Sequence, residues 1–321
     1  MKNLVSVIIP TFNRADLLSE SVTSVINQTY RPIECIVVDD GSTDHTSEII
    51  ARIKEKSDLG FSLVYLRQEN TGVQTARNIG TFASSGDFIQ YLDSDDLLYP
   101  NKIKDQVEFL NAHPACSGVF GNWDIGTPEK HTKANAFKSD DLITQFLTGR
   151  CIHTLSFLFR KSIVTQTGGW DVFIKRNQEI DFHIRALLAG ADFEYLNVNT
   201  GLWRTHDDAR ITNTTGLSDF HYFFNKMKII LSEKGLFTKE LSTKIAGMYV
   251  WFLNMHWNES RNEIYQFCLA ILKLEPERKL YSNKKWDLFF AVFGRKLGLR
   301  FWIAVNKHKK NTSTSKLTAL V

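Results

Sequence analysis

The chain has 321 residues, of which 43% are hydrophobic, and a formal net charge of +4. This length and hydrophobic content suffice for one large α/β domain with a smaller appended unit, and the lack of an internal repeat or long low-complexity stretch excludes a repeat array. The spacing of the four cysteines excludes a cysteine-based metal site and favours buried thiols in a reducing compartment; they are Cys35, Cys116, Cys151 and Cys268.

The first predicted strand is the apolar run Leu4–Ile9, which ends at Pro10. Because this run is only of strand length, we expect no signal peptide here. A helix follows, and Asn13 with Asp16 resembles a capping box at its start. The apolar face of that helix comprises Leu18, Val22, Val25 and Ile26.

Two further pairs of strand and helix follow. The strand Ile33–Val38 runs into the polar segment Asp39–Asp44, and isoleucines at helical spacing over 49–53 predict the next helix. The strand Phe61–Leu66 leads to a helix that carries Arg77. From the residues alone, Arg77 could equally be an exposed helix arginine, and the segment from Asp39 could be a turn before a helix N-cap.

The fourth predicted strand runs straight into three carboxylates. Residues 88–96 are Phe-Ile-Gln-Tyr-Leu-Asp-Ser-Asp-Asp. Like charges repel at a strand tip, so Asp93, Asp95 and Asp96 favour a bound cation; Asp93 and Asp95 share one side of an extended chain. The alternative is a polar turn, with Asp95 or Asp96 capping a helix that starts near Pro100.

The alternation of strands and helices predicts a parallel, doubly wound α/β sheet. Each of the four polar clusters lies just past the carboxyl end of a strand, and ligands of such sheets bind at that edge. Four clusters at one edge therefore favour a binding site over four independent turns.

The later part of the chain carries fewer signals. A turn, Gly168-Gly169-Trp170-Asp171, precedes a helix that begins Gln178-Glu179-Ile180-Asp181. Residues 216–275 have a mainly helical pattern, whereas residues 120–165 carry no readable motif.

The carboxyl-terminal end is basic and aromatic. Residues 276–321 hold eleven Lys and Arg against Glu277 and Asp287, a net +9 that leaves −5 for residues 1–275. Internal charges over 284–310 argue against a spanning helix and fit an interfacial helix in peripheral contact with a membrane. The alternative is an ordinary helix packed on the main domain or across a dimer. No nucleic-acid-reading motif is present, so we expect no nucleic-acid partner.

Four motifs occur in one order along the chain: Val7-Ile8-Ile9-Pro10-Thr11-Phe12-Asn13-Arg14, Val38-Asp39-Asp40-Gly41-Ser42-Thr43-Asp44, Ala76-Arg77-Asn78-x-Gly80 and Leu92-Asp93-Ser94-Asp95-Asp96. Their combination resembles the family 2 glycosyltransferases with the GT-A fold, over about residues 4–210. The resemblance implies a GT-A domain with a mostly parallel central sheet, which we place at 1–215, before a helical, basic and aromatic region at 216–321. It also implies transfer of a sugar from a nucleoside-diphosphate donor with inversion of the anomeric configuration.

The resemblance further implies a nucleotide site at the strand ends. Asp93, Ser94 and Asp95 would meet the diphosphate, with Asp95 as a ligand of Mg²⁺ or Mn²⁺. Such an ion suits the reaction because the leaving diphosphate gains negative charge as the glycosidic bond breaks. The family leads us to expect UDP. The base and ribose would lie against Pro10, Thr11, Phe12, Asn13, Arg14, Asp39 or Asp40, and Arg77.

Inversion requires a base that takes the proton of the attacking hydroxyl. The family keeps this base in an acidic pair at a helix start, after a Gly-Gly-aromatic-Asp turn. Alignment puts Glu179 at the base position and Gln178 at its acidic neighbour, a departure from the usual Glu-Asp pair, while Asp181 matches a further acidic position. The structural alternative is that Glu179 and Asp181 only complement the positive end of a helix.

One further segment, Leu202-Trp203-Arg204-Thr205-His206, resembles the family's aromatic-Arg-x-His segment and implies that His206 meets the metal or the diphosphate. Candidate acceptor or donor-sugar contacts are Asp96, Trp170, Asp181 and Trp203, although core packing is the better expectation for the two tryptophans.

We therefore predict an inverting, metal-dependent glycosyltransferase with a UDP-sugar donor and a saccharide or lipid-linked saccharide acceptor, in cell-surface polysaccharide biosynthesis. We expect the protein in the cytoplasm, where it could also lie peripherally on the cytoplasmic face of the inner membrane. Whether it forms a homo-oligomer is left open. One alternative is a sugar nucleotidyltransferase, although no glycine-rich phosphate loop is present. The other is a degenerate nucleotide-sugar-binding or scaffold protein, which the Gln178-Glu179 departure keeps open.

Overall fold

The computed structural model of the chain forms two compact units. Unit 1 comprises Met1–Phe146, Cys151–Phe173 and Gln178–Asp208, and unit 2 comprises Leu147–Arg150, Ile174–Asn177 and Ala209–Val321. Two short segments that precede Gln178 thus group with the carboxyl-terminal helices. The structure describes residues 3–54, 60–205, 216–256, 259–276, 278, 280, 296, 298–300 and 302–304.

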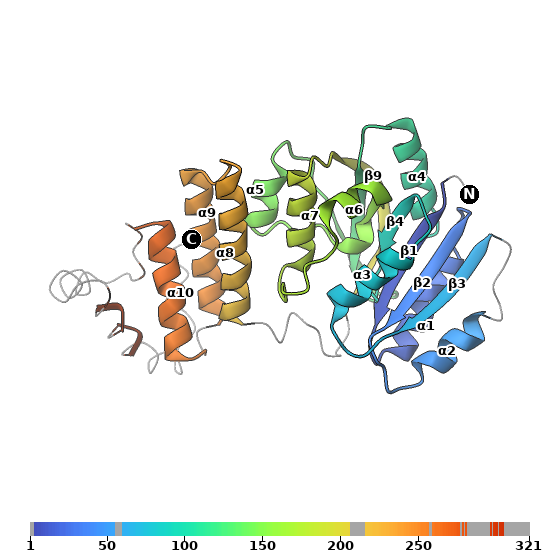
Figure 1. Cartoon of the computed structure of the whole chain (residues 1–321), viewed down its shortest axis with the longest axis horizontal. Helices are drawn as coiled ribbons and strands as arrows, with labels where there is room; N and C mark the ends of the chain where they lie inside the picture. The colour runs from blue at the N-terminus through green and yellow to red at the C-terminus, as the bar shows by residue number, and fades with distance from the viewer. Residues whose placement is uncertain are drawn as a thin grey trace. The chain divides into compact units, whose positions relative to one another are not determined.

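Within the described residues, unit 1 is built around a nine-stranded sheet (Figure 1). Its strands are β1 (Val5–Thr11), β2 (Ile33–Asp39), β3 (Phe61–Arg67), β4 (Phe88–Tyr91), β5 (Leu97–Leu98), β6 (Gly118–Gly126), β7 (His131–Ala134), β8 (Phe157–Arg160) and β9 (Phe193–Arg204). The helical elements are α1 (Ala15–Ile26), α2 (Thr46–Lys54), α3 (Val73–Ala83), α4 (Lys102–Ala112), α5 (Leu142–Leu147), η1 (Thr154–Ser156), α6 (Lys161–Thr167) and α7 (Gln178–Leu188).

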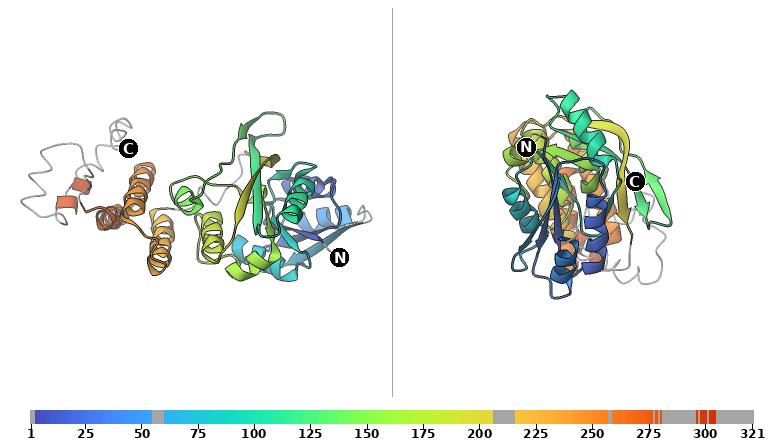
Figure 2. Two further views of the ribbon diagram at one scale, coloured as in Figure 1. Left: turned by 90° about the horizontal axis from the view of Figure 1, so that it is seen from above. Right: turned by 90° about the vertical axis from the view of Figure 1, so that its right-hand side faces the viewer.

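The amino-terminal half of the sheet has the predicted parallel, doubly wound arrangement. Its strand order is β3-β2-β1-β4, with every neighbouring pair parallel. Right-handed crossovers then put α1 and α2 on one face and α3 on the other, as Figure 2 shows. The chain order reverses between β1 and β4, so the edge beyond these two strands is the expected ligand site.

Pro10 is tolerated in the central strand β1 because its nitrogen faces a gap. The Ile8 carbonyl accepts a hydrogen bond from Leu92 N, and the Thr11 carbonyl accepts one from Asp40 N. Alternate residues of β1 therefore face β4 and β2 in turn, which directs the Pro10 nitrogen to the β4 side. Pairing with β4 ends at Ile8, so no ladder hydrogen bond is lost. The gap lies at the reversal of strand order.

Tight packing of α3 on the sheet depends on Gly80. All seven residues of β1 are buried, as expected of a strand covered on both faces. A Cβ at Gly80 would lie 2.4 Å from Ile8 Cγ2 and 3.2 Å from Val38 Cγ2. The absence of a side chain at this position therefore sets the close approach of α3.

We expect Gly80→Ala to lower the free energy of unfolding by about 1–2 kcal/mol, since overpacking outweighs the gain in helix propensity. The matched control is Gly247→Ala in α9, where a Cβ would meet no atom within 4 Å. That substitution should stabilise the protein by about 0.5–1 kcal/mol. Urea denaturation followed by circular dichroism measures both, and equal effects of the two substitutions would contradict this packing argument.

The other half of the sheet departs from the doubly wound pattern. Strand β8 pairs antiparallel with β4 and β6, and β5 pairs antiparallel with β9, while β6 and β9 are parallel. Close approach of β5 to β9 requires Gly201, where a Cβ would overlap the Leu97 carbonyl. This half brings the end of β9 to the loop between β4 and β5.

The described residues of unit 2 include three helices, α8 (Leu217–Glu233), α9 (Lys239–Met255) and α10 (Arg261–Leu274). Their core is aromatic: the rings of Phe220 and Phe252 stack at 4.1 Å, and Tyr249 lies 4.6 Å from Phe267. The short segments join this unit through α9, since the Arg176 guanidinium lies 4.4 Å from the Phe252 ring.

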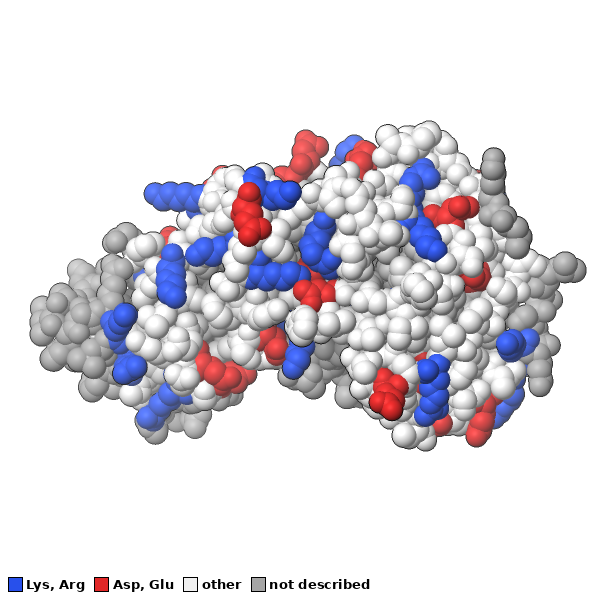
Figure 3. All heavy atoms as spheres, in the orientation of Figure 1, with Lys and Arg blue, Asp and Glu red and all other residues white. Residues whose placement is uncertain are grey.

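The basic carboxyl-terminal segment lies largely outside the described residues. Those of its residues that are described are packed: Leu299, Trp302 and Ile303 are buried, and the Arg300 guanidinium lies 4.9 Å from the Tyr265 ring. This contact with α10 lies within unit 2, so contact with a membrane and packing on the main domain or across a dimer both stay predictions. In the described part of the chain, no helix has the length and apolar character needed to span a bilayer. Figure 3 shows positive and negative side chains interspersed over the drawn face.

Candidate active site

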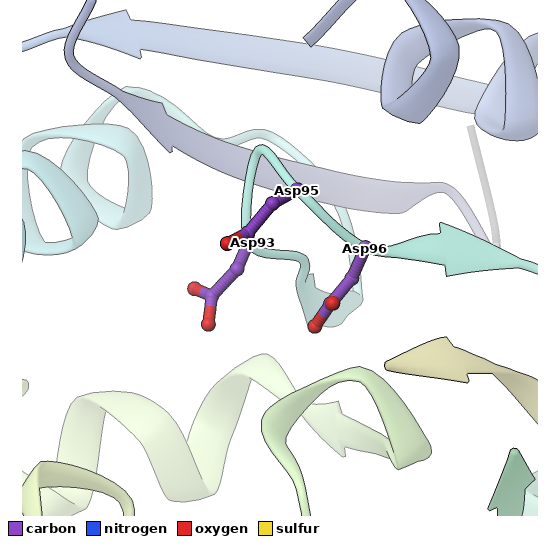
Figure 4. Close-up of side chains that lie close together, drawn as sticks. All are labelled: Asp93, Asp95 and Asp96. Atoms are coloured by element: carbon purple, nitrogen blue, oxygen red, sulfur yellow. The ribbon is translucent and has the colours of Figure 1, made fainter. Parts of the chain in front are cut away.

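Three carboxylates meet in the loop between β4 and β5, at the reversal of strand order. Ligand oxygens of Asp93, Asp95 and Asp96 lie within 4.8 Å of one another, and Figure 4 shows the side chains projecting from this one loop. Burial, followed by repulsion from Asp95 and Asp93, raises the pKa of Asp96 well above its usual range. Such oxygen donors fit a hard divalent cation, whose charge would relieve that repulsion.

Two arginines flank the acidic cluster. Arg14 Nη1 lies 2.7 Å from Asp95 Oδ2, and Arg77 Nη2 lies 2.6 Å from Asp93 Oδ1. The alternative in which Asp95 or Asp96 caps the next helix is wrong, because α4 begins after Asn101 and β5 intervenes. Carboxylates and guanidinium groups thus alternate at the edge where the diphosphate was predicted.

Arg77 is buried, so its interpretation as an exposed helix arginine is wrong. Its side chain is 3% exposed, and its guanidinium lies 4.2 Å from the Trp170 ring. Besides Asp93 it binds Gln178 Oε1 at 3.1 Å. Burial opposes its charge, but Asp93 and Glu179 outweigh this and raise the pKa of Arg77. Arg77 therefore joins the acidic loop to the start of α7.

We expect Arg77→Met to lower the free energy of unfolding by about 2 kcal/mol. The value lies below the usual cost of breaking a buried pair because the Asp93 side chain is 36% exposed. Arg52→Met is the control, since the Arg52 pair with Glu48 is exposed and spans 3.9 Å. Urea denaturation of both variants provides the test, and a loss for Arg77→Met no larger than for Arg52→Met would refute a structural role.

Glu179 lies in the first turn of α7, next to the residue that binds Arg77. Burial raises the pKa of Glu179 above its ordinary value of 4.5, with Arg77 opposing and Asp93 adding to the increase. A carboxylate with a raised pKa is a stronger proton acceptor, as a general base requires. Gln178 replaces the family's acidic residue with a neutral amide that still accepts from Arg77.

The other predicted residues of this region are mainly packed. Asp181 is 1% exposed, and its Oδ2 lies 2.8 Å from both Nε and Nη2 of Arg185. Trp170 is 3% exposed and stacks on Phe182 at 4.7 Å. Trp203 is half-buried and stacks on His153 at 4.3 Å. Contact of these residues with a sugar stays a prediction. Of the two tryptophans, Trp203 is the more exposed.

Asp39 and Asp40 organise the loops beside the nucleotide edge. Asp39 accepts from Ser42 N at 2.7 Å and from the Tyr65 hydroxyl at 2.5 Å. Burial and the Asp39 carboxylate raise the pKa of Tyr65 to about 12. Asp40 accepts from Gly72 N at 2.9 Å, at the start of α3. These bonds fix the turn after β2 and the loop that carries α3 and Arg77.

The predicted capping box at Asn13 is wrong. The N-cap of α1 is Arg14, and the helix receives its cap from another loop, because Asp44 Oδ2 accepts from Ala15 N at 3.1 Å. Asn13 instead has a left-handed φ of 51° and accepts from Thr43 N at 2.7 Å. Pro10 and Thr11 are buried beside it, whereas Phe12 is 44% exposed at the strand end.

Arg204 belongs to the segment Leu202–His206, but no role was assigned to it from the sequence. It is 4% exposed; its backbone N–H donates to Asp96 Oδ1 at 3.0 Å, and its Nε donates to the Asp95 carbonyl. Its Nη1 donates to Glu20 Oε2 at 2.6 Å, which ties the acidic loop to α1. The Ser21 hydroxyl adds a bond to the carbonyl of the buried residue Ser94 at 2.9 Å. His206 lies outside the described residues.

Comparison with known proteins finds relatives of this chain. Residues 6–168 match glycosyl transferase family 2. TuaG of Bacillus subtilis, for which a role in teichuronic acid biosynthesis is proposed, is 38% identical over 131 residues, 40% of this chain and 51% of TuaG. An uncharacterised glycosyltransferase of Haemophilus influenzae is 41% identical over 107 residues, 33% of this chain and 42% of that protein. The chain thus spans about half or less of the length of these curated relatives.

Solved structures share the fold. Residues 1–349 of Staphylococcus aureus TarS, in complex with UDP-GlcNAc, match with a TM-score of 0.65 and 19% identity, over 96% of this chain and 92% of that one. The mannosyltransferase PcManGT of Pyrobaculum calidifontis, in complex with GDP-Man and Mn²⁺, has a TM-score of 0.54 and 17% identity, over 97% and 87%. These matches confirm the predicted α/β fold with a mostly parallel central sheet and a helical carboxyl-terminal region.

Proposed function

This chain belongs to glycosyl transferase family 2, and we propose that it transfers a sugar from a nucleoside-diphosphate donor to a saccharide or lipid-linked saccharide acceptor in cell-surface polysaccharide biosynthesis. One observation carries the proposal: Asp93, Asp95 and Asp96 meet within 4.8 Å at the reversal of strand order, flanked by Arg14 and Arg77. The proposed role of TuaG supports the biosynthetic context.

The donor is proposed to be a UDP-sugar. TarS was solved with UDP-GlcNAc and PcManGT with GDP-Man, so proteins of this fold bind both nucleotide classes. We assign the base and ribose to residues 10–14, Asp39, Asp40 and Arg77, all at one edge of the sheet. Arg14 and Arg77 would add positive charge beside the nucleotide, and each contacts a carboxylate of the acidic cluster.

A divalent ion, Mg²⁺ or Mn²⁺, is proposed to complete the site, with Asp95 as a ligand beside Asp93 and Asp96. When bound, it compensates the negative charge that develops on the leaving diphosphate. PcManGT with Mn²⁺ is a precedent for such an ion on this fold. His206 stays a predicted contact of the metal or diphosphate.

Glu179 is proposed to act as the base of an inverting displacement. The acceptor oxygen forms a bond to the anomeric carbon while the bond to the diphosphate breaks, and the acceptor proton passes to the Glu179 carboxylate. The raised pKa of Glu179 suits this role. The residue lies beyond the part matched to the family, so its assignment depends on the helix start and on the contact of its neighbour Gln178 with Arg77.

The direct test is calorimetric titration of UDP, GDP, dTDP and CMP into the full-length protein, with and without Mn²⁺. We expect one nucleoside diphosphate to bind and Mn²⁺ to tighten that binding, because Asp95 would hold the ion and its charge would attract the phosphates. Binding of none of the four would overturn the proposal and favour a scaffold protein. Product analysis with the matching sugar nucleotide separates a transferase, which releases a nucleoside diphosphate, from a nucleotidyltransferase, which releases pyrophosphate.

A further inference from the structure

Unit 2 contains an open cavity of about 110 Å³ whose walls come from α8, α9 and α10. A site for a single water needs only about 10–15 Å³, so this cavity admits a group of several atoms. His221 and Lys228 are seven residues apart, which is about two turns, so they lie on the same face of α8. Gln266 and Lys273 repeat that spacing on α10, so each helix presents one polar wall.

The charge of the cavity differs from that of its surroundings. Residues 216–276 carry seven Lys and Arg and six Asp and Glu, which is close to balance. The cavity lining nevertheless includes Lys228 and Lys273 and no carboxylate. Lys244 pairs with Glu240 and Arg278 pairs with Glu275, and neither Lys228 nor Lys273 takes part in these two ion pairs. The cavity lining therefore carries a net positive charge, which suits an anion.

Neutral donors and aromatic rings complete the lining. His221 Nδ1 lies 3.0 Å from the Tyr249 hydroxyl, and Asn225 and Gln266 also line the cavity. The Phe237 ring lies 5.9 Å from Lys228 Nζ. Lysines suit phosphate as point charges, and amides supply further donors to its oxygens. Aromatic faces suit a carbon skeleton attached to the anion more than a bare ion.

We propose that this cavity binds an organic phosphate, with Lys228 and Lys273 holding the phosphate group and the rings of Phe237 and Tyr249 contacting the attached carbon skeleton. The phosphate could come from a free phosphomonoester or from a phosphodiester within a longer chain. The site is distinct from the nucleotide-binding residues, all of which belong to unit 1. The inference therefore stands apart from the proposed glycosyl transfer.

The test is calorimetric titration of the full-length protein in EDTA with glycerol 3-phosphate, with the phosphodiester of two glycerols, and with glycerol. The variant Lys228→Gln/Lys273→Gln removes both charges from the cavity. Its matched control, Lys239→Gln/Lys244→Gln, removes the same charge from exposed positions of α9. We expect the first variant to bind phosphate at least roughly tenfold more weakly and the control to bind as the parent does.

A second readout locates the ligand. Burial and the Lys273 charge lower the pKa of His221. A phosphate beside it would offset that charge, so the pKa of His221, followed by NMR of its ring, should rise on addition of ligand. Binding of the monoester alone indicates a small phosphorylated metabolite, and binding of the diester as well indicates a phosphodiester chain; both support the proposal.

Two results would overturn it: failure of both phosphates to bind, or unchanged affinity in the Lys228→Gln/Lys273→Gln variant. Titration of that variant with the nucleoside diphosphate keeps the two hypotheses separate. Nucleotide binding should be retained, because neither lysine belongs to the nucleotide edge. Loss of phosphate binding with nucleotide binding intact is the expected pattern, whereas loss of both would point to misfolding, which circular dichroism detects.

Discussion

We expect replacement of Glu179 with glutamine to lower the turnover number about a thousandfold and to leave nucleotide binding unchanged. The amide has nearly the shape of the carboxylate but cannot take the proton of the acceptor hydroxyl. Donor binding should persist because the groups that bind nucleotide, Arg14 and the acidic cluster, come from other elements. Steady-state kinetics with the matching sugar nucleotide gives the turnover number, and calorimetry gives the affinity.

The control for this variant is Glu108→Gln, an exposed position on α4 where turnover should not change. The pH dependence adds a second check. Glu179 acts as the deprotonated carboxylate, so activity should fall as the pH drops through its pKa; burial places that acid limb above pH 4.5. Turnover of Glu179→Gln within tenfold of the parent would place the base elsewhere.

We expect replacement of Asp95 with asparagine to abolish the Mn²⁺-dependent part of nucleotide binding, with a loss of affinity on the order of a hundredfold. The substitution removes an anionic oxygen ligand and leaves Arg14 without the carboxylate that it contacts at 2.7 Å. An amide oxygen binds a hard cation less strongly than a carboxylate. Calorimetric titration of the nucleoside diphosphate with and without Mn²⁺ measures the change.

Asp140→Asn is the matched control, because Asp140 is exposed and lies outside the acidic cluster. It should bind nucleotide with the affinity and the metal dependence of the parent. If Asp95→Asn kept the same ratio of affinities with and without Mn²⁺, Asp95 would not be a metal ligand. The acidic cluster would then serve only to orient the two arginines.

The amino-terminal half of the fold was predictable from the sequence because its signals are local. Continuous apolar runs marked the strands, and the predicted run Leu4–Ile9 differs from β1, Val5–Thr11, by one residue at its start and two at its end. The extension through Pro10 depends on where pairing with β4 ends, which the sequence does not state. Asp93 and Asp95 meet in a turn and not along an extended chain as predicted, because β4 ends at Tyr91 and the Asp96 N–H donates to the Asp93 carbonyl at 3.0 Å.

The features that could not be predicted depend on contacts between distant residues. Arg204 binds Glu20, 184 positions away, and no local pattern indicates that pair. The cap of α1 comes from Asp44 in another loop and not from the capping box that Asn13 and Asp16 were predicted to form. Antiparallel pairing of β8 follows from tertiary packing of residues 157–160, in a stretch without a readable motif.

The interrupted course of the chain limits how the protein can be divided. Unit 1 is not one continuous stretch, because Leu147–Arg150 and Ile174–Asn177 group with the carboxyl-terminal helices. A truncation before α8 would keep both segments but delete Met248, which Gly149 approaches, and Phe252, against which Arg176 lies. The second segment leads directly into Gln178 and Glu179. The chain is therefore not modular at this boundary, and an exchange of helical regions between relatives must carry these two segments with it.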